Sequence, residues 1–322
     1  MNMKKAGAVI IPTIIAAFII GYMLFRVWDD LIVAVQSATP SYLILAVVIC
    51  VLAWFLRGFR YQYILEKLLV RINMWLSTAC IYVSQTANLI VPARLGDLVR
   101  LLILRHEVDA TYSKGLSSLV VERFFDIITI AILGAMALPF ALNMPEWFST
   151  VIAFTLVLCF LFLIILFAFG KLSSTNKYIN LVLNLLNEVK QASLGLYATG
   201  ILGVSSIIIW LTDSAICWVI AMMFQQSIPF IIIILAIVIG NLVKAVPLTP
   251  GGVGTYELAV ALTLEVSGTP AAIATLIAVI DHLVKNLITL AGGIVSLYVF
   301  GEWSVDLLKR AFSKGLDKGD MV

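Results

Sequence analysis

A short run rich in proline and glycine, Pro247-Leu-Thr-Pro250-Gly251-Gly252-Val-Gly254-Thr-Tyr-Glu257, lies between two strongly apolar segments of the sequence. Proline lacks a backbone donor and ends a helix, and glycine lets the backbone bend or approach another group closely. The run therefore predicts a break between two helices. Inside a bilayer, a broken helix is tolerated only where protein or a water-filled cavity satisfies its backbone polar groups. If the run lies at membrane depth, it marks a pathway.

The composition is that of a helical membrane protein. Of 322 residues, 62% are hydrophobic and 12% are charged, and the mean hydropathy is +1.09. Several apolar segments approach the roughly 20 residues that a helix needs to cross a bilayer. We therefore expect an all-α, polytopic membrane protein that forms a single transmembrane domain over residues 1–322. The four cysteines lie in apolar segments without metal-site spacing, so no disulfide, metal or cofactor is expected.

The lengths of the apolar segments predict about six full spans and two re-entrant hairpins of half-helices. The full spans are expected near residues 6–25, 40–56, 115–142, 148–169, 193–224 and 270–300. Residues 74–91 are partly polar and lead into a proline, and residues 256–267 are too short to cross a hydrocarbon core about 30 Å thick. The expected hairpins cover residues 74–105 and 228–267. A full crossing by residues 74–91 is the alternative for the first hairpin.

Lysine and arginine gather in the connections on one side of this topology, and cytoplasmic loops are known to collect them. Only Arg26 falls clearly on the outer side. We therefore expect a protein of the cell membrane with both termini in the cytoplasm, a cytoplasmic tail at residues 301–322 and a cytoplasmic amphipathic helix at residues 171–192. The basic cluster after the second span is interpreted as part of the same positive-inside bias, and it contains Arg57, Arg60, Lys67 and Arg71.

A weak internal repeat relates the two breaks. Pro92-Ala-Arg-Leu-Gly96-Asp aligns with Pro250-Gly-Gly-Val-Gly254-Thr, and a charged pattern follows each of them. The charged patterns are Glu122-Arg123-Phe-Phe-Asp126 and Asp281-His282-Leu-Val-Lys285. In the expected topology the first hairpin enters from the cytoplasm and the second from outside, as in transporters with inverted repeats. We expect repeats at residues 40–142 and 193–300, with chance recurrence as the alternative.

Ionisable residues inside the spans are the main candidates for a site. A charge at the bilayer centre costs roughly 2.5–3.5 kcal/mol on insertion scales, so such groups usually face the bundle interior and pair. Helical spacing predicts the pairs Arg123–Asp126 and Asp281–Lys285, and structural ion pairs that only lock helices together are the alternative. The candidates for binding and translocation are Arg94, Asp97, Arg100, Glu122, Arg123, Asp126, Asp213, Lys244, Pro250, Gly251, Gly252, Gly254, Glu257, Asp281 and Lys285.

The chemistry of the first break favours a phosphate ligand. Arg94 and Arg100 lie where a half-helix N-terminus also presents free amides to an anion, and arginine can grip a phosphate with two parallel hydrogen bonds. Signatures of soluble enzymes are missing, because no phosphate-binding loop, HExxH or GxSxG motif is present. We therefore expect a protein that is not an enzyme, although its carboxylates leave an intramembrane transferase open.

Three ordered motifs resemble those of a known family. They are Pro92-x-Arg94-x-Gly96-Asp97-x-x-Arg100, Glu122-Arg123-x-x-Asp126 and Pro247-x-x-Pro250-Gly251-Gly252-x-Gly254-x-x-Glu257. In this order they resemble the lysylphosphatidylglycerol synthase transmembrane-region family, a group of flippase-like membrane proteins. The resemblance covers nearly the whole chain, and it departs at Asp97, where family members usually carry Glu.

The resemblance implies that the protein moves a lipid between leaflets. The implied cargo is either aminoacylated phosphatidylglycerol or a polyprenyl-phosphate-linked sugar, so the expected partners are an anionic lipid and the membrane, but no nucleic acid. A separate lipid-modifying enzyme and a second copy of the chain are further candidate partners. Bifunctional family members carry a soluble aminoacyl-transferase domain, which is not expected in residues 301–322. The alternatives are an intramembrane transferase acting on a lipid phosphate and a non-transporting scaffold for a lipid-modifying enzyme.

Overall fold

The computed structural model describes residues 3–90, 96–140, 146–169, 175–246, 248–301 and 303, and within these residues helices joined by turns and loops are the regular secondary structure, with no strand. The expected all-α class is therefore confirmed. The α-helices are α1 Met3–Arg26, α2 Trp28–Gln36, α3 Ser41–Lys67, α4 Met74–Ile90, α5 Val99–Val108, α6 Tyr112–Ala137, α7 Glu146–Phe169, α8 Lys177–Ser193, α9 Leu196–Met223, α10 Phe230–Ala245, α11 Thr255–Val266 and α12 Ala271–Phe300. Two short 3₁₀ turns are η2 Leu138–Phe140 and η3 Pro250–Gly252.

Local sequence explains several helix ends. Pro40, Pro229 and Pro270 immediately precede α3, α10 and α12, where the missing proline donor costs no helical hydrogen bond. Thr111 caps α6, because its side chain accepts the backbone N–H of Lys114. α2 lies in a connection for which no helix is expected from the apolar pattern.

Among the described residues, α3, α7, α9 and α12 contain stretches long and apolar enough to cross a membrane. The expectation of about six full spans is thus confirmed only in part. In α1, only the segment Pro12–Arg26 forms an apolar helix, and this segment is shorter than the four long ones. α6 has 26 residues, but Glu122, Arg123 and Asp126 interrupt its apolar character. The chain is a membrane protein with several apolar helices, and the full number of crossings stays a prediction.

The two expected hairpins correspond to pairs of short helices. α4 has 17 residues, α5 has 10, α10 has 16 and α11 has 12. At 1.5 Å per residue, α11 is about 18 Å long, which is less than the roughly 30 Å of a hydrocarbon core. The break between α4 and α5 includes residues 91–95, which lie outside the described residues, as does Pro247. Whether the two pairs re-enter the membrane, and from which sides, stays a prediction.

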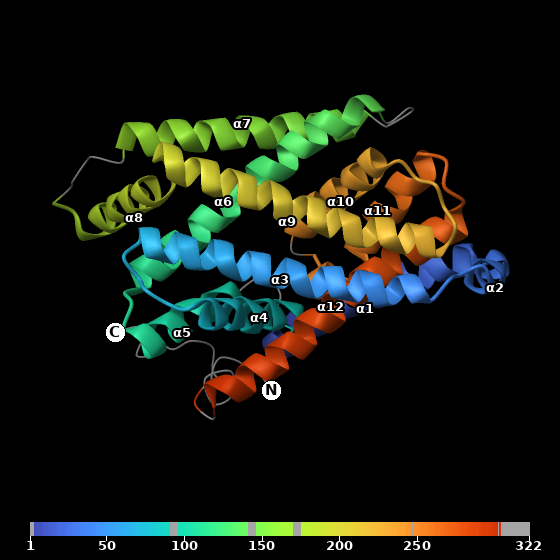
Figure 1. The fold of residues 1–322 in the computed structure, drawn as a ribbon, viewed down its shortest axis with the longest axis horizontal. Helices are drawn as coiled ribbons and strands as arrows, with labels where there is room; N and C mark the ends of the chain where they lie inside the picture. The colour runs from blue at the N-terminus through green and yellow to red at the C-terminus, as the bar shows by residue number, and fades with distance from the viewer. Residues whose placement is uncertain are drawn as a thin grey trace.

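The amphipathic helix expected at residues 171–192 is present as α8, within the described part of that segment. α8 packs against α6 and α7 and buries Val189 and Ala192, while Ile179 and Val182 are exposed. Figure 1 shows α8 at the end of the molecule where α7 ends and α9 begins. Of the expected cytoplasmic tail at residues 301–322, only Gly301 and Trp303 are among the described residues.

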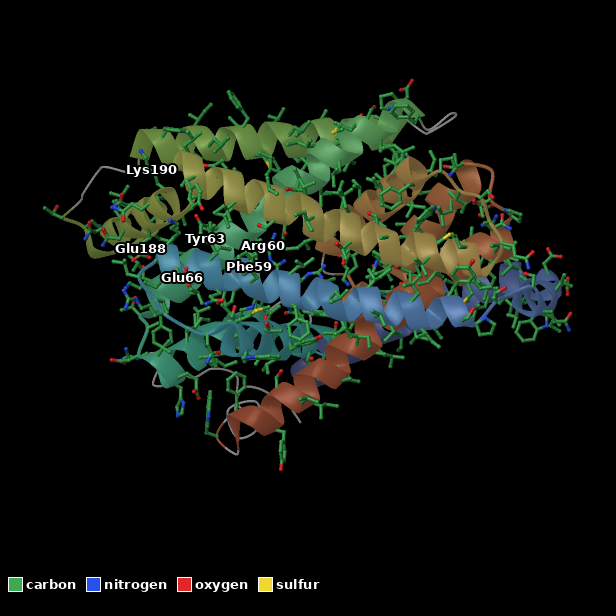
Figure 2. The ribbon with its side chains drawn as sticks, in the orientation of Figure 1. Phe59, Arg60, Tyr63, Glu66, Glu188 and Lys190 are labelled. Carbon is green, nitrogen blue, oxygen red and sulfur yellow. The ribbon has the colours of Figure 1, made fainter. Side chains whose placement is uncertain are left out.

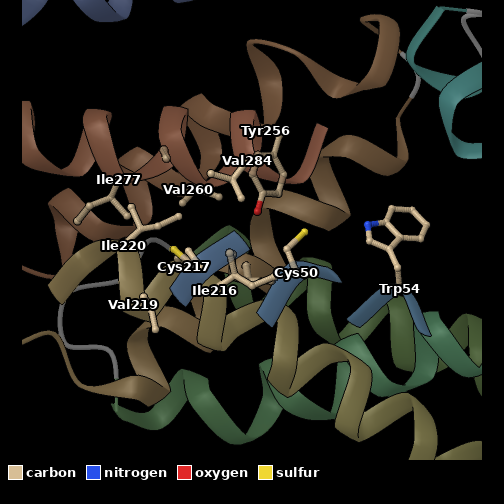
Figure 3. Close-up of a cluster of buried hydrophobic side chains, with 14 of the residues drawn as sticks. Cys50, Trp54, Ile216, Cys217, Val219, Ile220, Tyr256, Val260, Ile277 and Val284 are labelled. Atoms are coloured by element: carbon tan, nitrogen blue, oxygen red, sulfur yellow. The ribbon is translucent and has the colours of Figure 1, made fainter. Parts of the chain in front are cut away.

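The largest buried cluster joins the long helices to the second hairpin. Figure 3 shows its side chains, including Cys50 of α3, Cys217 of α9, Tyr256 of α11 and Ile277 of α12. All four cysteines are buried and free, as expected. Gly240 allows α10 to approach α11 closely, because a Cβ at this position would lie 2.6 Å from a Val260 methyl carbon. This packing holds α3, α9, α11 and α12 around one interior space.

Candidate functional site

A cavity of about 240 Å³ lies in the interior of the molecule, where α4 meets the turn after α10. Its walls come from α3, α4, α6, α9, α10, α11 and α12, with Gly251 and Gly252 of η3 between them. The close approach of the two breaks requires glycine, because a Cβ on Gly251 would lie 2.9 Å from a methyl carbon of Leu89 at the end of α4. The cavity therefore lies at the junction of the two hairpin candidates.

The cavity is lined by more positive than negative groups. Its cations are Arg57, Arg60, Arg123, Lys244 and Lys285, and its carboxylates are Glu122, Asp126 and Asp213. His282 also lines it. Five cations and three carboxylates line the cavity, while Asp97 and Asp281 contact Arg123 and Lys285 from behind the lining. The lining itself is therefore net positive, which favours an anionic ligand.

One wall is built on α6, whose charged residues pair with two other helices. Arg60 of α3 donates to Asp126 at 2.6 Å and to Ser206 of α9 at 2.8 Å. The predicted pair Arg123–Asp126 is present with a separation of 3.7 Å. Arg123 also donates to Asp97 at 2.7 Å, so the first break is tied to α6.

A deeper ion pair lies behind this wall. Arg100 is fully buried, and its guanidinium donates to Glu122 at 2.5 Å and to Ser84 at 2.9 Å. Asp97 lies beside it and accepts hydrogen bonds from Asn88, Ser84 and Gln85 of α4. These contacts fasten the short helix α5 to α4 and α6, and Arg100 does not line the cavity. The geometry of Arg100 is that of a structural lock.

The interpretation of Arg57 and Arg60 as cytoplasmic charges that only reflect the positive-inside bias is wrong. α3 continues to Lys67, well beyond the expected end at residue 56, and it carries both arginines into the interior. Arg57 pairs with Asp213 of α9 at 2.5 Å, and Figure 2 shows Arg60 on the side of α3 that faces α9. Both partners lie far away in sequence, so the local pattern contains no signal for them. The i, i+3 spacing of the two arginines was the available hint that they share a face.

The opposite wall is formed by α10, α11 and α12. The predicted pair Asp281–Lys285 is present at 2.8 Å, and Tyr256 donates its hydroxyl to Asp281 at 2.7 Å. Glu257 is buried and contacts His282 at 2.8 Å, while the other ring nitrogen of His282 lies 3.1 Å from the Lys244 ammonium. Tyr256 and His282 belong to this site although neither is among the predicted site residues.

The break after α10 depends on glycine conformation. Gly251, Gly252 and Gly254 have φ values of 62°, 77° and 87°, a region that favours glycine. Pro250 begins η3, and the N–H of Gly254 donates to Glu257 at 2.7 Å, which fastens the start of α11. The predicted helix break is confirmed.

The predicted site residues fall into two groups. Those that line the cavity are Glu122, Arg123, Asp126, Asp213, Lys244, Gly251, Gly252 and Lys285. Those that contact or adjoin a lining residue are Asp97, Arg100, Pro250, Glu257 and Asp281, and Gly254 contacts Glu257. Arg94 lies outside the described residues.

One buried donor at the cavity has no protein acceptor. The Nε atom of Arg60 is buried and makes no hydrogen bond within the described part of the chain, although Arg60 lines the cavity. Buried polar groups are normally satisfied, and this Nε is itself shielded from the cavity, so it marks an unsatisfied donor behind the cavity wall and not a ligand contact. No cluster of His, Cys, Asp and Glu suited to a metal ion occurs among the described residues.

Comparison with known proteins identifies relatives of this membrane region. The model of the family described as lysylphosphatidylglycerol synthase TM region matches residues 9–293, which confirms the resemblance seen in the three motifs. Glycosyltransferase AglD of Haloferax volcanii is 31% identical over 315 residues, a match that covers 84% of this chain and 50% of the relative. UPF0104 membrane protein MJ1078 of Methanocaldococcus jannaschii is 25% identical over 225 residues, covering 66% of this chain and 93% of the relative.

The chain thus spans about half the length of Glycosyltransferase AglD. This relative contradicts the expectation that the protein is not an enzyme, because a protein named as a glycosyltransferase shares 31% identity over most of the chain. The physical reason is that the motifs sought, which position phosphate, zinc or a serine nucleophile, do not cover every transferase. Carboxylates such as Glu122 and Asp126 can perform acid–base chemistry without any such motif.

Proposed function

The chain belongs to the lysylphosphatidylglycerol synthase TM region family, and from this premise we propose that it moves an anionic lipid between the two leaflets of the cell membrane. The observation that carries the proposal is the net positive cavity between the two helix breaks. Charged groups inside a membrane protein are expensive and typically line the pathway of a polar substrate. Broken helices at such a cavity are typical of transporters.

The headgroup phosphate binds by replacing carboxylates as the partner of the cavity cations. It engages Arg57, Arg60 and Arg123 on one wall and then Lys285 on the other. Asp213 and Asp281 hold Arg57 and Lys285 while the site is empty. Because removing one partner of a buried pair costs about 3–5 kcal/mol, a cation leaves its carboxylate only when another anion takes its place.

The hydrocarbon chains of the lipid stay outside the cavity. Ile127 of α6 lines the cavity and is 42% exposed, which places an opening beside it. Ile127 is apolar, so it suits a lipid chain that follows the headgroup from outside. A headgroup inside and chains outside is the arrangement that transfer between leaflets requires.

The transport proposal includes a topology. Six full spans and two re-entrant hairpins, with both termini in the cytoplasm, would form inverted repeats at residues 40–142 and 193–300. The first hairpin would enter from the cytoplasm and the second from outside. The gathering of Lys and Arg in one set of connections supports this orientation. Labelling of single cysteines placed in the connections of intact cells tests it.

The cargo has two candidates, an aminoacylated phospholipid and a sugar linked to a polyprenyl phosphate. The relative named Glycosyltransferase AglD favours the sugar-linked lipid. The same relative favours a second candidate function, transfer of a sugar to or from a lipid phosphate, in which Asp126 would act as the base. A separate lipid-modifying enzyme would supply or use the lipid, and the chain would act alone or with a second copy.

Purified protein in liposomes tests both functions. Fluorescent phosphatidylglycerol and a fluorescent polyprenyl-phosphate sugar are added to one leaflet, and a membrane-impermeant reductant reports how much label has crossed. Arg57→Gln and Lys285→Gln are expected to slow crossing at least about tenfold, since each removes a cavity cation that the headgroup needs. Lys67→Gln, at the exposed end of the same helix as Arg57, is the matched control.

Mass spectrometry of the recovered lipids separates the two functions. Translocation changes the leaflet of the lipid and leaves its mass unchanged, whereas sugar transfer changes its mass. Wild-type rates of crossing in both cavity variants, with unchanged lipid masses, would show that the cavity is not the translocation site.

A further inference from the structure

A chain of acid and base groups links the second helix break to the cavity. The Lys244 ammonium lies 3.1 Å from Nε2 of His282, Nδ1 of His282 lies 2.8 Å from Glu257, and Glu257 accepts the backbone N–H of Gly254 at 2.7 Å. His282 is 1% exposed and Glu257 is 5% exposed. The headgroup contacts proposed above make no use of His282 or Glu257. A buried histidine that reaches a cavity is an expensive feature unless it has a role.

The contacts define where the histidine carries its proton. Glu257 accepts a backbone N–H with one oxygen and faces Nδ1 of His282 with the other, so Nδ1 is the protonated nitrogen and donates to Glu257. Nε2 is then unprotonated and accepts a hydrogen bond from Lys244. In the empty site His282 is therefore neutral, between a cation and a carboxylate.

Protonation of His282 is incompatible with the position of Lys244. An N–H on Nε2 would point at an ammonium that can only donate, and two positive charges would face each other. Lys244 must leave before His282 takes a second proton. Lys244 lines the cavity and has a long flexible side chain, so an anion in the cavity can draw its ammonium away from the ring.

The other groups around His282 do not remove this conflict. From α11, the ring of Tyr256 lies 4.5 Å from that of His282, but its hydroxyl is committed to Asp281. On α12 itself, Asp281 is paired with Lys285. Across the cavity, α9 and α3 contribute Asp213 and Arg57, which pair with each other. The charges of α6 are also paired: Asp126 with Arg60, Glu122 with Arg100, and Arg123 with Asp97.

We propose that His282 is a proton-binding site coupled to the headgroup site, so that one proton enters the cavity with each anionic headgroup. The headgroup attracts Lys244, a proton from the bulk solvent reaches Nε2 through the cavity water and forms an N–H bond, and that N–H donates to the headgroup phosphate. When the headgroup leaves, Lys244 returns and the proton departs from Nε2. This inference rests on the proposed function and adds a driving force to it, the proton gradient.

Calorimetry measures the proton directly. Short-chain phosphatidylglycerol and a sugar phosphodiester of a short prenol serve as probes, because the charge of a phosphodiester does not change between about pH 5.5 and about pH 8, the range in which histidine titrates. Binding is measured in two buffers that differ in ionisation enthalpy. The expected result is uptake of close to one proton per bound headgroup near neutral pH, with binding up to about tenfold tighter for each pH unit lowered.

Two histidine variants make the assignment specific, because the chain contains only His106 and His282. His282→Gln retains an amide that can contact Glu257, so it is expected to bind the probes without proton uptake and without pH dependence. His106→Gln alters a half-exposed ring away from the cavity and is expected to behave like the wild type. If His282→Gln does not fold, Lys244→Met provides the second test. Without the opposing ammonium, His282 is expected to take up its proton before the headgroup arrives, so proton uptake on headgroup binding is expected to fall.

The outcomes separate this inference from the proposed function. Binding of a probe by the wild type without proton uptake overturns the coupling and leaves the headgroup site intact. Undiminished uptake in His282→Gln, or in Lys244→Met where that variant serves as the second test, also overturns it. If neither probe binds to the wild type at any pH, the proposed function itself fails.

Discussion

Replacing Glu122 with Gln tests the difference between a locking ion pair and an exchangeable one. Glu122 faces the fully buried guanidinium of Arg100 at 2.5 Å and also lies 3.7 Å from Arg60. The variant leaves Arg100 charged and without its main carboxylate. Asp213→Asn is the matched comparison, since it also removes one carboxylate from an arginine at 2.5 Å.

The surroundings of the two arginines determine the expected magnitudes. The Arg100 side chain is 0% exposed, so its charge has no route to water, and breaking such a pair costs about 3–5 kcal/mol of unfolding free energy. Arg57, the partner of Asp213, is 19% exposed and lines the cavity, so solvent can partly replace the lost carboxylate. For Asp213→Asn we expect about 1–2 kcal/mol. The two substitutions should therefore differ by at least about 1 kcal/mol.

Unfolding in mixed micelles, followed by tryptophan fluorescence at increasing denaturing detergent, measures this difference. Glu66→Gln, at an exposed position near the end of α3, is the control and should change stability by less than about 0.5 kcal/mol. Equal losses for Glu122→Gln and Asp213→Asn would refute the distinction between a buried lock and a cavity pair. A smaller loss of stability for Glu122→Gln than for Asp213→Asn would indicate that the Arg57–Asp213 pair, and not the Arg100–Glu122 pair, is the structural one.

Two further substitutions test the second hairpin. Gly252→Ala should slow lipid crossing and lower the melting temperature, because φ is 77° and the new Cβ would lie 2.6 Å from Cγ of Lys244. Gly203→Ala, in an open helical position, is the control. Equal rates of crossing for the two variants in the liposome assay would contradict a role of the turn in transport. Tyr256→Phe should cost about 1–3 kcal/mol of unfolding free energy, because Asp281 loses a hydroxyl donor. A loss below about 0.5 kcal/mol in the same micelle titration would show that Lys285 alone satisfies the carboxylate.

Local features of the site were predictable from sequence because helical geometry is local. Arg123 and Asp126, like Asp281 and Lys285, lie within one turn of each other, so spacing alone places each pair on one face. The helix break at residues 250–254 was predictable for the same reason, since proline and glycine act on their own backbone.

Pairs between distant helices were not predictable in this way. Arg57 meets Asp213 across 156 positions, and Arg60 meets Asp126 across 66. From hydropathy, the second span was predicted to end at residue 56, because the arginines that follow are polar. A buried arginine that is paired with a carboxylate can nevertheless lie within a helix, and α3 continues to Lys67. For the same reason His282 could be noticed beside Asp281 in sequence, whereas its contacts with Glu257 and Lys244 required the fold.

The ion pairs inside the membrane region differ in whether the proposed substrate could reach them. Arg100 is fully buried away from the cavity, so its pair with Glu122 can only hold α5 to α6. Arg57, Arg123 and Lys285 are 19%, 30% and 18% exposed and line the cavity, so each can exchange a carboxylate for a phosphate without crossing apolar protein. Such an exchange keeps each cation paired, while the displaced Asp213 faces the cavity and the displaced Asp281 keeps the hydroxyl of Tyr256 as a donor. The cavity is therefore suited to releasing an anionic headgroup as well as to binding it, because Asp126 and Asp213 take their arginines back when the headgroup leaves.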